Sequence, residues 1–138
     1  MEKIKQLINT TKTLNILYVE DEKYKSVELY KNYFNKIDVA VDGIDGLNKY
    51  LHYYKTNKKY YDIVISDLSM PKMNGIEMSK NILQKNPTQN IIIVSAHNES
   101  EQLEKLMNMG IIYYLRKPLE LELFNDILLN IINKSKLQ

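Results

Sequence analysis

The chain has 138 residues, of which 44% are hydrophobic and 26% charged, so it can bury one ordinary core and is predicted to form one domain. Its 19 basic and 17 acidic residues are interspersed and leave a net charge of +2, which gives no indication of a nucleic-acid-binding surface. Because there is no cysteine, disulfides, thiolate metal sites and a cysteine nucleophile are excluded.

The N-terminal extension, residues 1–13, is polar where a signal peptide would have its apolar core. No apolar stretch reaches the ~20 residues of a membrane span, so we expect a cytoplasmic protein without membrane insertion. Ile4, Leu7 and Ile8 in the extension have helical spacing and are suited to docking on the last helix. The default expectation for such a chain end is nevertheless a frayed arm. Residues 14–138 form the predicted domain.

Short apolar runs rich in Ile and Val predict five strands. The runs are mostly continuous rather than alternating, which is typical of parallel strands that are covered on both faces. They lie at residues 14–19, 37–41, 61–66, 91–95 and 111–115.

Helical periodicity follows each of the first four runs. After the fifth run, a helix is predicted from about Glu120 to Lys134, beyond the helix breaker Pro118. The helix preceding the fifth strand has Asn98 as its expected N-cap and Gly110 just past its end. In chain order, the apolar stripes are Val27, Tyr30 and Phe34; Leu47, Tyr50, Leu51 and Tyr54; and Leu103, Leu106 and Met107. Between the second and third of these, Ile76, Lys80 and Leu83 share a weaker helical face that ends at Pro87.

Strands and helices thus alternate five times, which predicts a doubly wound α/β domain with a five-stranded parallel sheet and five helices. By analogy with flavodoxin-like sheets, we expect the strand order 2-1-3-4-5. In such sheets, ligands bind outside the carboxyl ends of the strands, near the point where the strand order reverses.

Polar side chains follow four of the predicted strands at this edge. Glu20 and Asp21 follow the first strand, and Asp67 follows the third. Ser95 ends the fourth strand, and Lys117 follows the fifth. Each residue alone has an ordinary explanation as a helix cap, a turn former or a surface residue. Their joint placement at the ends of different strands is what predicts a site.

Converging carboxylates repel one another unless a cation is present, and a set of oxygen ligands without cysteine favours Mg²⁺. Next to such a metal, Asp67 is suited to act as a nucleophile toward phosphorus. Lys117 is suited to neutralise the phosphoryl oxygens, and the Ser95 hydroxyl to donate a hydrogen bond to one of them.

Four sequence blocks carry a family resemblance: ILYVEDE at 16–22, DLSMPKMNG at 67–75, SA at 95–96 and KP at 117–118. Together they resemble the receiver domain of bacterial two-component response regulators, of the single-domain, chemotaxis-regulator-like kind. The resemblance covers roughly residues 14 to 134, which is nearly the whole chain.

The resemblance implies that Asp67 is the phospho-acceptor and that Asp21 binds Mg²⁺, with Glu20 acting partly through water. The backbone carbonyl of Ser69 would be a further metal ligand. The acidic pair is Glu-Asp, where many members of the family have Asp-Asp. The longer side chain of Glu20 is therefore expected to alter the metal geometry without abolishing the site.

By the same resemblance, Ser95 senses the phosphoryl group and Lys117 pairs with it, while Tyr114 is the aromatic switch whose ring turns inward. Ser69 and His97 resemble the positions that tune how long the phosphoryl group persists.

The function implied is that of a stand-alone response regulator, a phospho-acceptor that assists its own phosphorylation and dephosphorylation rather than an enzyme. Its phosphoryl donor would be a sensor histidine kinase or a histidine phosphotransfer protein. Since the sequence ends within a few residues of the last predicted helix, we expect no DNA-binding domain and no direct contact with nucleic acid. The output is then expected to be contact with a downstream protein, or a phosphorelay in which the phosphoryl group passes on to a histidine of a partner.

Apolar residues spread over roughly 240° of the last predicted helix, which is about twice the width that one core-facing stripe needs. This helix, together with the helix that starts at Asn98 and the strand carrying Tyr114, is expected to present a surface for a partner or a homodimer. The alternative is that the last helix packs against residues 1–13.

Other functions are less well supported by the residues. A phosphohydrolase with an aspartyl nucleophile needs a second Asp two positions later, where this chain has Ser69. A dinucleotide or flavin site needs a glycine-rich turn after the first strand, where Glu20 and Asp21 would repel a pyrophosphate. A phosphorylation-independent docking module with the receiver fold stays open as the alternative function.

Overall fold

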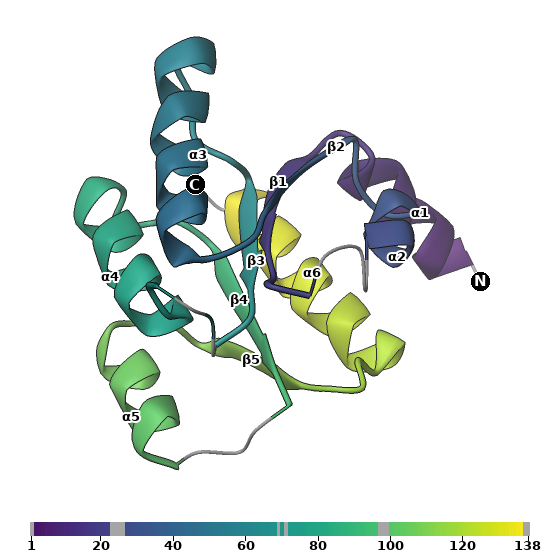
Figure 1. Cartoon of the computed structure of the whole chain (residues 1–138). Coiled ribbons are helices and arrows are strands. Elements are labelled where there is room, and N and C mark those ends of the chain that lie inside the picture. Colours follow the sequence, from purple (N-terminus) through teal and green to yellow (C-terminus); the bar gives the residue numbers. More distant parts are fainter. Residues whose placement is uncertain (1, 23–26, 69, 71, 97–99, 137–138) are drawn as a thin grey trace.

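The computed structural model describes residues 2–22, 27–68, 70, 72–96 and 100–136, without the side chains of 100, 101 and 136, and forms one α/β sandwich (Figure 1). The strands are β1 (Asn15–Val19), β2 (Lys36–Ala40), β3 (Ile63–Ser66), β4 (Ile91–Ser95) and β5 (Tyr113–Arg116). The helices are α1 (Glu2–Thr11), α2 (Val27–Lys31), α3 (Gly43–Asn57), α4 (Gly75–Lys85), α5 (Ser100–Asn108) and α6 (Leu121–Lys136). None of these helices has the length and apolar character that a membrane span requires.

The five strands form one parallel sheet in the order β2-β1-β3-β4-β5, which confirms the predicted order. The order reverses at β1, so the carboxyl ends of β1 and β3 lie side by side at the switch point. In this register Val19, the last residue of β1, is paired with Ser66, the last residue of β3.

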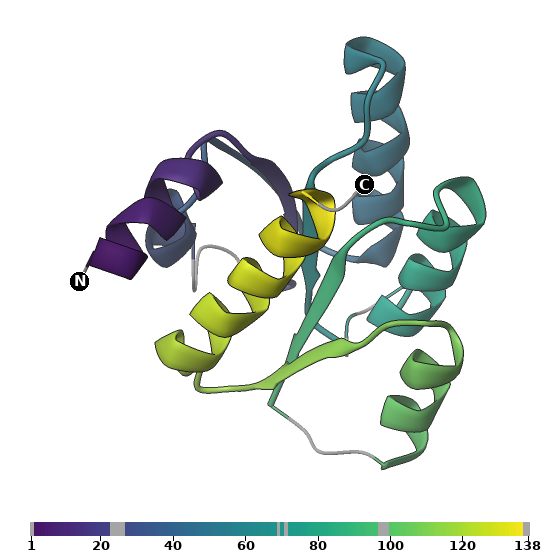
Figure 2. The ribbon, with the colours of Figure 1, turned by 180° about the vertical axis from the view of Figure 1, so that it is seen from behind.

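The sheet is covered on both faces, which explains why its strands are apolar runs rather than alternating ones. Helices α1, α2 and α6 lie on one face and α3, α4 and α5 on the other, as the two opposite views show (Figures 1 and 2). Alternate strand residues enter the two cores: Ile16 and Tyr18 pack on the first side, and Leu17 and Val19 on the second.

Helix ends follow the local chemistry of the sequence. The Asp42 side chain caps α3 by accepting a 2.8 Å hydrogen bond from the Asp45 amide, and Asn74 caps α4 in the same way through the Glu77 amide. Gly110 follows α5 with a φ of +89°, a left-handed conformation that glycine adopts easily, as predicted. The expected N-cap Asn98 lies outside the described residues.

Several predicted helix stripes are wrong in detail. In α3, Leu51 and Tyr54 are 38% and 42% exposed, while Tyr50 and Tyr53 are buried. The reason is that the glycines of α3 allow its backbone to approach the sheet: a Cβ at Gly46 would lie 3.0 Å from Val19. The buried side is therefore the one that carries Gly43, Gly46, Tyr50 and Tyr53.

The stripe predicted for α4 is also wrong. Its buried side consists of Gly75, Met78, Ser79 and Ile82 rather than Ile76, Lys80 and Leu83. Likewise Met107, which the predicted stripe of α5 includes, is 63% exposed. Short helices with few apolar residues are compatible with more than one inward face, and packing against neighbouring elements selects one.

Helix α1 corrects the expectation of a frayed N-terminal arm and adds a sixth helix to the predicted five. It contacts α6, and its residue Leu7 is only 3% exposed in the same core cluster as β1 and β3. The Lys12 side chain donates a 2.9 Å hydrogen bond to the Lys31 carbonyl at the end of α2. The extension is therefore docked.

The chain itself thus covers part of the wide apolar face of α6. Phe124, Leu128 and Ile131 are buried in the core that Leu7 joins. Leu121 and Leu123, at the start of the helix, remain 47% and 48% exposed. The alternative explanation of the wide apolar face, packing against the N-terminal extension, is correct for part of it.

Truncating the docked side chain should measure this contact. We expect Leu7→Ala to lower the free energy of unfolding by about 2 to 3 kcal/mol, because it leaves a cavity under α1. Ile4→Ala on the same helix, where the side chain is 47% exposed, should cost less than about 0.5 kcal/mol. Urea denaturation of both variants provides the comparison, and equal small losses would mean that α1 does not dock in solution.

Tyrosines link α3 to the chain entering β3. Tyr53 and Tyr61 stack with ring centroids 3.9 Å apart, and Tyr50 packs beside Tyr61 at 6.2 Å. The Tyr50 hydroxyl donates to Gln89 and the Tyr61 hydroxyl to Asp38, each at 2.6 Å. Burial raises the pKa of both hydroxyls, and the Asp38 carboxylate raises that of Tyr61 further.

This cluster predicts a loss of stability at high pH. A tyrosine whose pKa is raised by folding stabilises the native state below the pKa of the unfolded chain, about 10, and that contribution is lost as the pH rises further. We expect the free energy of unfolding to fall progressively as the pH rises above about 10, and less steeply in Tyr61→Phe. Denaturation curves at several pH values test this, and parallel pH dependences would contradict it.

Candidate functional site

Backbone pairing places the first acidic residue at the switch point. The Glu20 amide donates a 3.0 Å hydrogen bond to the Ala40 carbonyl, so the ladder between β1 and β2 continues one residue beyond the strand. The side chain of Glu20 is only 3% exposed. Asp21, the next residue, is exposed.

The end of β3 holds Asp67 in a similar way. Its amide donates to the Val19 carbonyl at 2.9 Å, and its own carbonyl accepts a 2.7 Å hydrogen bond from the Ser66 hydroxyl. The Leu68 amide donates to Asp67 Oδ1 at 2.7 Å, which orients the carboxylate and leaves Oδ2 toward Lys117. The side chain is 12% exposed and therefore accessible at the edge of the sheet.

The loop from β3 to α4 is held by close backbone contacts. The Gly75 amide donates to the Leu68 carbonyl at 2.8 Å, and the Gly43 amide donates to the Met73 carbonyl at 3.0 Å. A Cβ on Gly75 would lie 2.3 Å from the Asp67 carbonyl oxygen, so only glycine fits there. Both glycines therefore position the loop that carries Asp67, a role that the sequence analysis did not assign to either of them.

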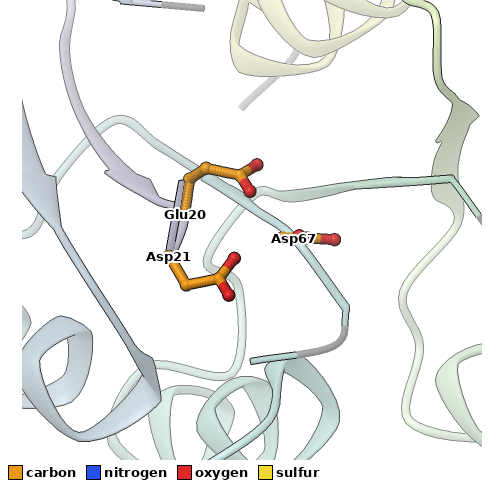
Figure 3. Close-up of side chains that lie close together, drawn as sticks. All are labelled: Glu20, Asp21 and Asp67. Carbon is orange, nitrogen blue, oxygen red and sulfur yellow. The ribbon is translucent and has the colours of Figure 1, made fainter. Parts of the chain in front are cut away.

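The three acidic side chains come together as predicted. Ligand oxygens of Glu20, Asp21 and Asp67 all lie within 4.8 Å of one another, with the side chains pointing into a common space (Figure 3). An octahedral Mg²⁺ with bonds of about 2.0–2.1 Å spans roughly 3 to 4 Å between ligand oxygens. The cluster therefore fits such an ion if the carboxylates move slightly closer together, or if one of them binds the ion through water.

Lys117 lies at the same edge, just after β5, and its side chain reaches across the ends of the intervening strands to Glu20. Its amide donates to the Ser95 carbonyl at 2.9 Å, which extends the pairing of β4 with β5. Its Nζ lies 2.9 Å from Glu20 Oε2 and 3.5 Å from Asp67 Oδ2. One ammonium thus bridges two of the three carboxylates.

The electrostatics of the site follow from this arrangement. Burial raises the pKa of the Glu20 carboxyl; the hydrogen bond from Lys117 opposes that shift, and the Asp67 charge adds to it. Burial alone would lower the pKa of Lys117, but the hydrogen bond to Glu20 and the charges of Asp67 and Glu20 raise it above its usual value. Lys117 therefore stays charged. The carboxylates repel one another and need a nearby cation to remain ionised together.

Ser95 and Tyr114 lie on neighbouring strands. Ser95 ends β4 and is 1% exposed, while Tyr114 is half-buried on β5 and packs against the core under α3, α4 and α5. Ile93, two residues before Ser95, faces that same core and pairs with Tyr114. Because side chains alternate along a strand, Ser95 and Tyr114 face the same side of the sheet. Ser69 and His97, the other two positions of interest, lie outside the described residues.

A pocket of about 450 Å³ opens beside the carboxylates, and the sequence analysis did not foresee it. Glu20, Asp67 and Lys117 form its polar side. The other walls are mostly apolar and consist of Tyr18, Tyr30, Val94, Ala96, Pro118 and Leu119. The tyrosines give no sequence signal for such a pocket, because they are also ordinary core residues of β1 and α2.

Comparisons with known proteins agree with this geometry. The family model described as the response regulator receiver domain matches residues 16–128. The chain is similar to chemotaxis protein CheY of Treponema pallidum, with 33% identity over 109 residues that cover 76% of this chain and 73% of that protein. It is also similar to response regulator ArlR of Staphylococcus aureus, with 35% identity over 78% of this chain but only 47% of ArlR.

Among solved structures, the chain resembles the CheX-CheY-BeF3-Mg complex of Borrelia burgdorferi. The TM-score is 0.72 with 27% sequence identity, and the match covers 94% of each chain.

Proposed function

The chain belongs to the response regulator receiver domain family, and we propose that it receives a phosphoryl group on Asp67 from a sensor histidine kinase or a histidine phosphotransfer protein. Receiver domains of this kind act in phosphorylation-based two-component signalling. The observation that supports Asp67 as acceptor is its place at the switch point, with Lys117 Nζ 3.5 Å from Oδ2 and two further carboxylates within reach. We take residues 14–138 as the receiver and residues 1–13 as an N-terminal extension, of which α1 is docked on the receiver.

The proposed transfer is a displacement at phosphorus. An oxygen of Asp67 forms the new bond to phosphorus while the bond from phosphorus to the donor nitrogen breaks and the histidine leaves. Since the Leu68 amide holds Oδ1, the oxygen available for attack is Oδ2, beside Lys117. The ammonium would then offset the charge of the phosphoryl oxygens, and water would later remove the group.

The proposed cofactor is Mg²⁺, held by Asp21 and Asp67 and by Glu20 partly through water. The family resemblance implies the backbone carbonyl of Ser69, which lies outside the described residues, as a further ligand. When bound, it would neutralise negative charge on the carboxylates and on the incoming phosphoryl group. The chemistry of the donor set supports this assignment, because all three described ligands are hard carboxylate oxygens. The CheY structure from B. burgdorferi, which contains Mg²⁺, is consistent with it.

The proposed readout uses Ser95 and Tyr114. Ser95 would donate to the phosphoryl group, and Tyr114 on the adjacent strand would turn inward as Ser95 moves. The surface formed by α5, β5 and the start of α6 would then bind a downstream protein or a second copy of the chain. Exposed apolar residues on these elements or next to them are Met107, Ile112, Leu121 and Leu123. That the CheY of Borrelia burgdorferi was solved in complex with CheX supports a protein as the target.

Mass spectrometry tests the proposal. After incubation with acetyl phosphate and Mg²⁺, the intact protein should gain the mass of one phosphoryl group, and addition of EDTA should prevent the gain. The Mg²⁺ dependence comes from the carboxylate cluster, which repels a phosphoryl donor when no cation is bound. No gain under any condition would favour a docking module that works without phosphorylation.

A further inference from the structure

Helix α3 carries a second apolar stripe, which faces outward. This outer stripe consists of Ile44, Leu47, Leu51 and Tyr54, which are spaced three, four and three residues apart. Ile44, Leu51 and Tyr54 are 43%, 38% and 42% exposed, and Leu47 is half-buried. Another side of the helix, which carries its glycines, packs on the sheet. The spacing of the outer stripe is that of the contact positions between two packed helices, and the stripe spans about 15 Å of helix axis.

The C-terminal end of the outer stripe is basic. Tyr54 stacks on Tyr60 with ring centroids 4.2 Å apart, and the Tyr60 hydroxyl donates a 3.3 Å hydrogen bond to the Lys85 carbonyl at the end of α4. The lysines that adjoin this aromatic pair, through the chain or through that hydrogen bond, are all exposed: Lys55, Lys58, Lys59 and Lys85. Within the part of the chain that the structure describes, none of the four forms an ion pair.

This surface is distinct from the one proposed above for the readout. Helix α4 lies between α3 and α5 in both views (Figures 1 and 2). The C-terminal turns of α3 also project beyond α4 (Figure 1). A helix that binds along the outer stripe therefore need not contact α5, β5 or α6.

The side chains of the surface decide between possible partners. Ile44 and Leu51 offer no aromatic ring on which a base could stack, so the stripe favours a peptide over a nucleic acid. A second copy of the chain would bring the same lysines. Its α3 has one acidic residue, Asp45, whose carboxylate already lies 3.4 Å from Lys49 Nζ. Charge complementarity therefore favours a partner that supplies carboxylates of its own.

We propose that the outer stripe and the lysines at its end bind an acidic amphipathic helix of a partner protein. Apolar side chains with the same spacing on the partner would pack between Ile44, Leu51 and Tyr54, and its carboxylates would face the lysines. This inference goes beyond the function proposed above, because the binding requires neither a phosphoryl group on Asp67 nor a metal ion.

Fluorescence anisotropy with two labelled peptides and the unphosphorylated protein tests this. Each peptide has about three heptads with Leu at the a and d positions, and the e and g positions are Glu in one peptide and Lys in the other. We expect the wild-type protein to bind the acidic peptide at least about tenfold more tightly than the basic one. Leu51→Ser should weaken binding of the acidic peptide at least about fivefold, because it removes apolar area from the contact. Lys55→Glu should weaken it at least about threefold, and less so at high salt.

Leu123→Ser is the matched control, since it makes the same change at a leucine of α6 that is 48% exposed. It should change the affinity less than about twofold. A loss as large as that of Leu51→Ser would place the peptide on the readout surface and overturn the inference. Far-UV circular dichroism and thermal melts identify a variant that fails to fold, and Leu51→Ala then replaces Leu51→Ser.

Three further results would contradict the proposal. These are equal binding of the two peptides, tighter binding of an oligouridylate RNA than of the acidic peptide, and a dimer in sedimentation that Leu51→Ser dissociates. The last would assign the stripe to a second copy of the chain. Since no step of the test uses phosphorylation, the result stands whether or not Asp67 accepts a phosphoryl group, and the proposed function is judged separately by mass.

Discussion

Replacing Asp67 by Asn should block uptake of a phosphoryl group from acetyl phosphate, so that any remaining uptake is more than about a hundredfold slower than in the wild type. The neutral amide is a poor nucleophile, although its oxygen can still accept the hydrogen bond from the Leu68 amide and keep the local geometry. The measurement is intact mass after incubation with Mg²⁺, followed over time. Because one charge leaves a cluster of like charges, we expect the variant to be no less stable than the wild type.

Asp126→Asn is the matched control, since it makes the same chemical change at an exposed position of α6. It should take up the phosphoryl group at the wild-type rate. If Asp67→Asn gained the same mass as this control, another residue would be the acceptor, and fragmentation of the labelled protein would locate it.

Gly75→Ala should destabilise the protein and impair phosphorylation together. Alanine is favoured over glycine in a helix interior by about 1 kcal/mol, which is an upper limit at Gly75 because this residue is the first of α4. The added Cβ would lie 2.3 Å from the Asp67 carbonyl oxygen, a backbone atom that cannot move unless the loop carrying Asp67 moves as well. Overpacking of this kind costs about 3 kcal/mol, so the clash outweighs the propensity. We expect a net loss of about 2 kcal/mol in urea denaturation and a slower gain of phosphoryl mass.

Lys80→Ala is the control for that variant, because Lys80 is exposed on the same helix. It should change the free energy of unfolding by less than about 0.5 kcal/mol and leave the rate of phosphorylation unchanged. A Gly75→Ala protein as stable and as reactive as this control would mean that the loop adjusts without cost.

Much of the site can be predicted from the sequence, because its residues directly follow strands. Apolar runs mark the strands, and parallel strands bring their carboxyl ends to one edge, so the amino-acid pattern predicts that Glu20, Asp21, Asp67 and Lys117 meet there. The strand order itself came from analogy with known sheets, since periodicity does not say which strands are neighbours.

Helix packing was less predictable than strand placement. Each strand is buried on both faces, so its placement does not require predicting which face is buried. An amphipathic helix with few apolar residues can bury one of several faces. The buried side of α4, with Met78 and Ile82, and the docking of Leu7 against the core that also holds Phe124, depend on neighbours that lie far away in the sequence.

Local patterns are enough to specify the alternation of strands and helices and the set of acidic and basic groups at the sheet edge. They do not specify that Lys117 donates to Glu20 more closely than it approaches Asp67, which is a property of the folded chain. Glu20 and Lys117 are 97 positions apart, and their contact depends on the register of the sheet and on side-chain length and burial. Local propensity carries no information on any of these.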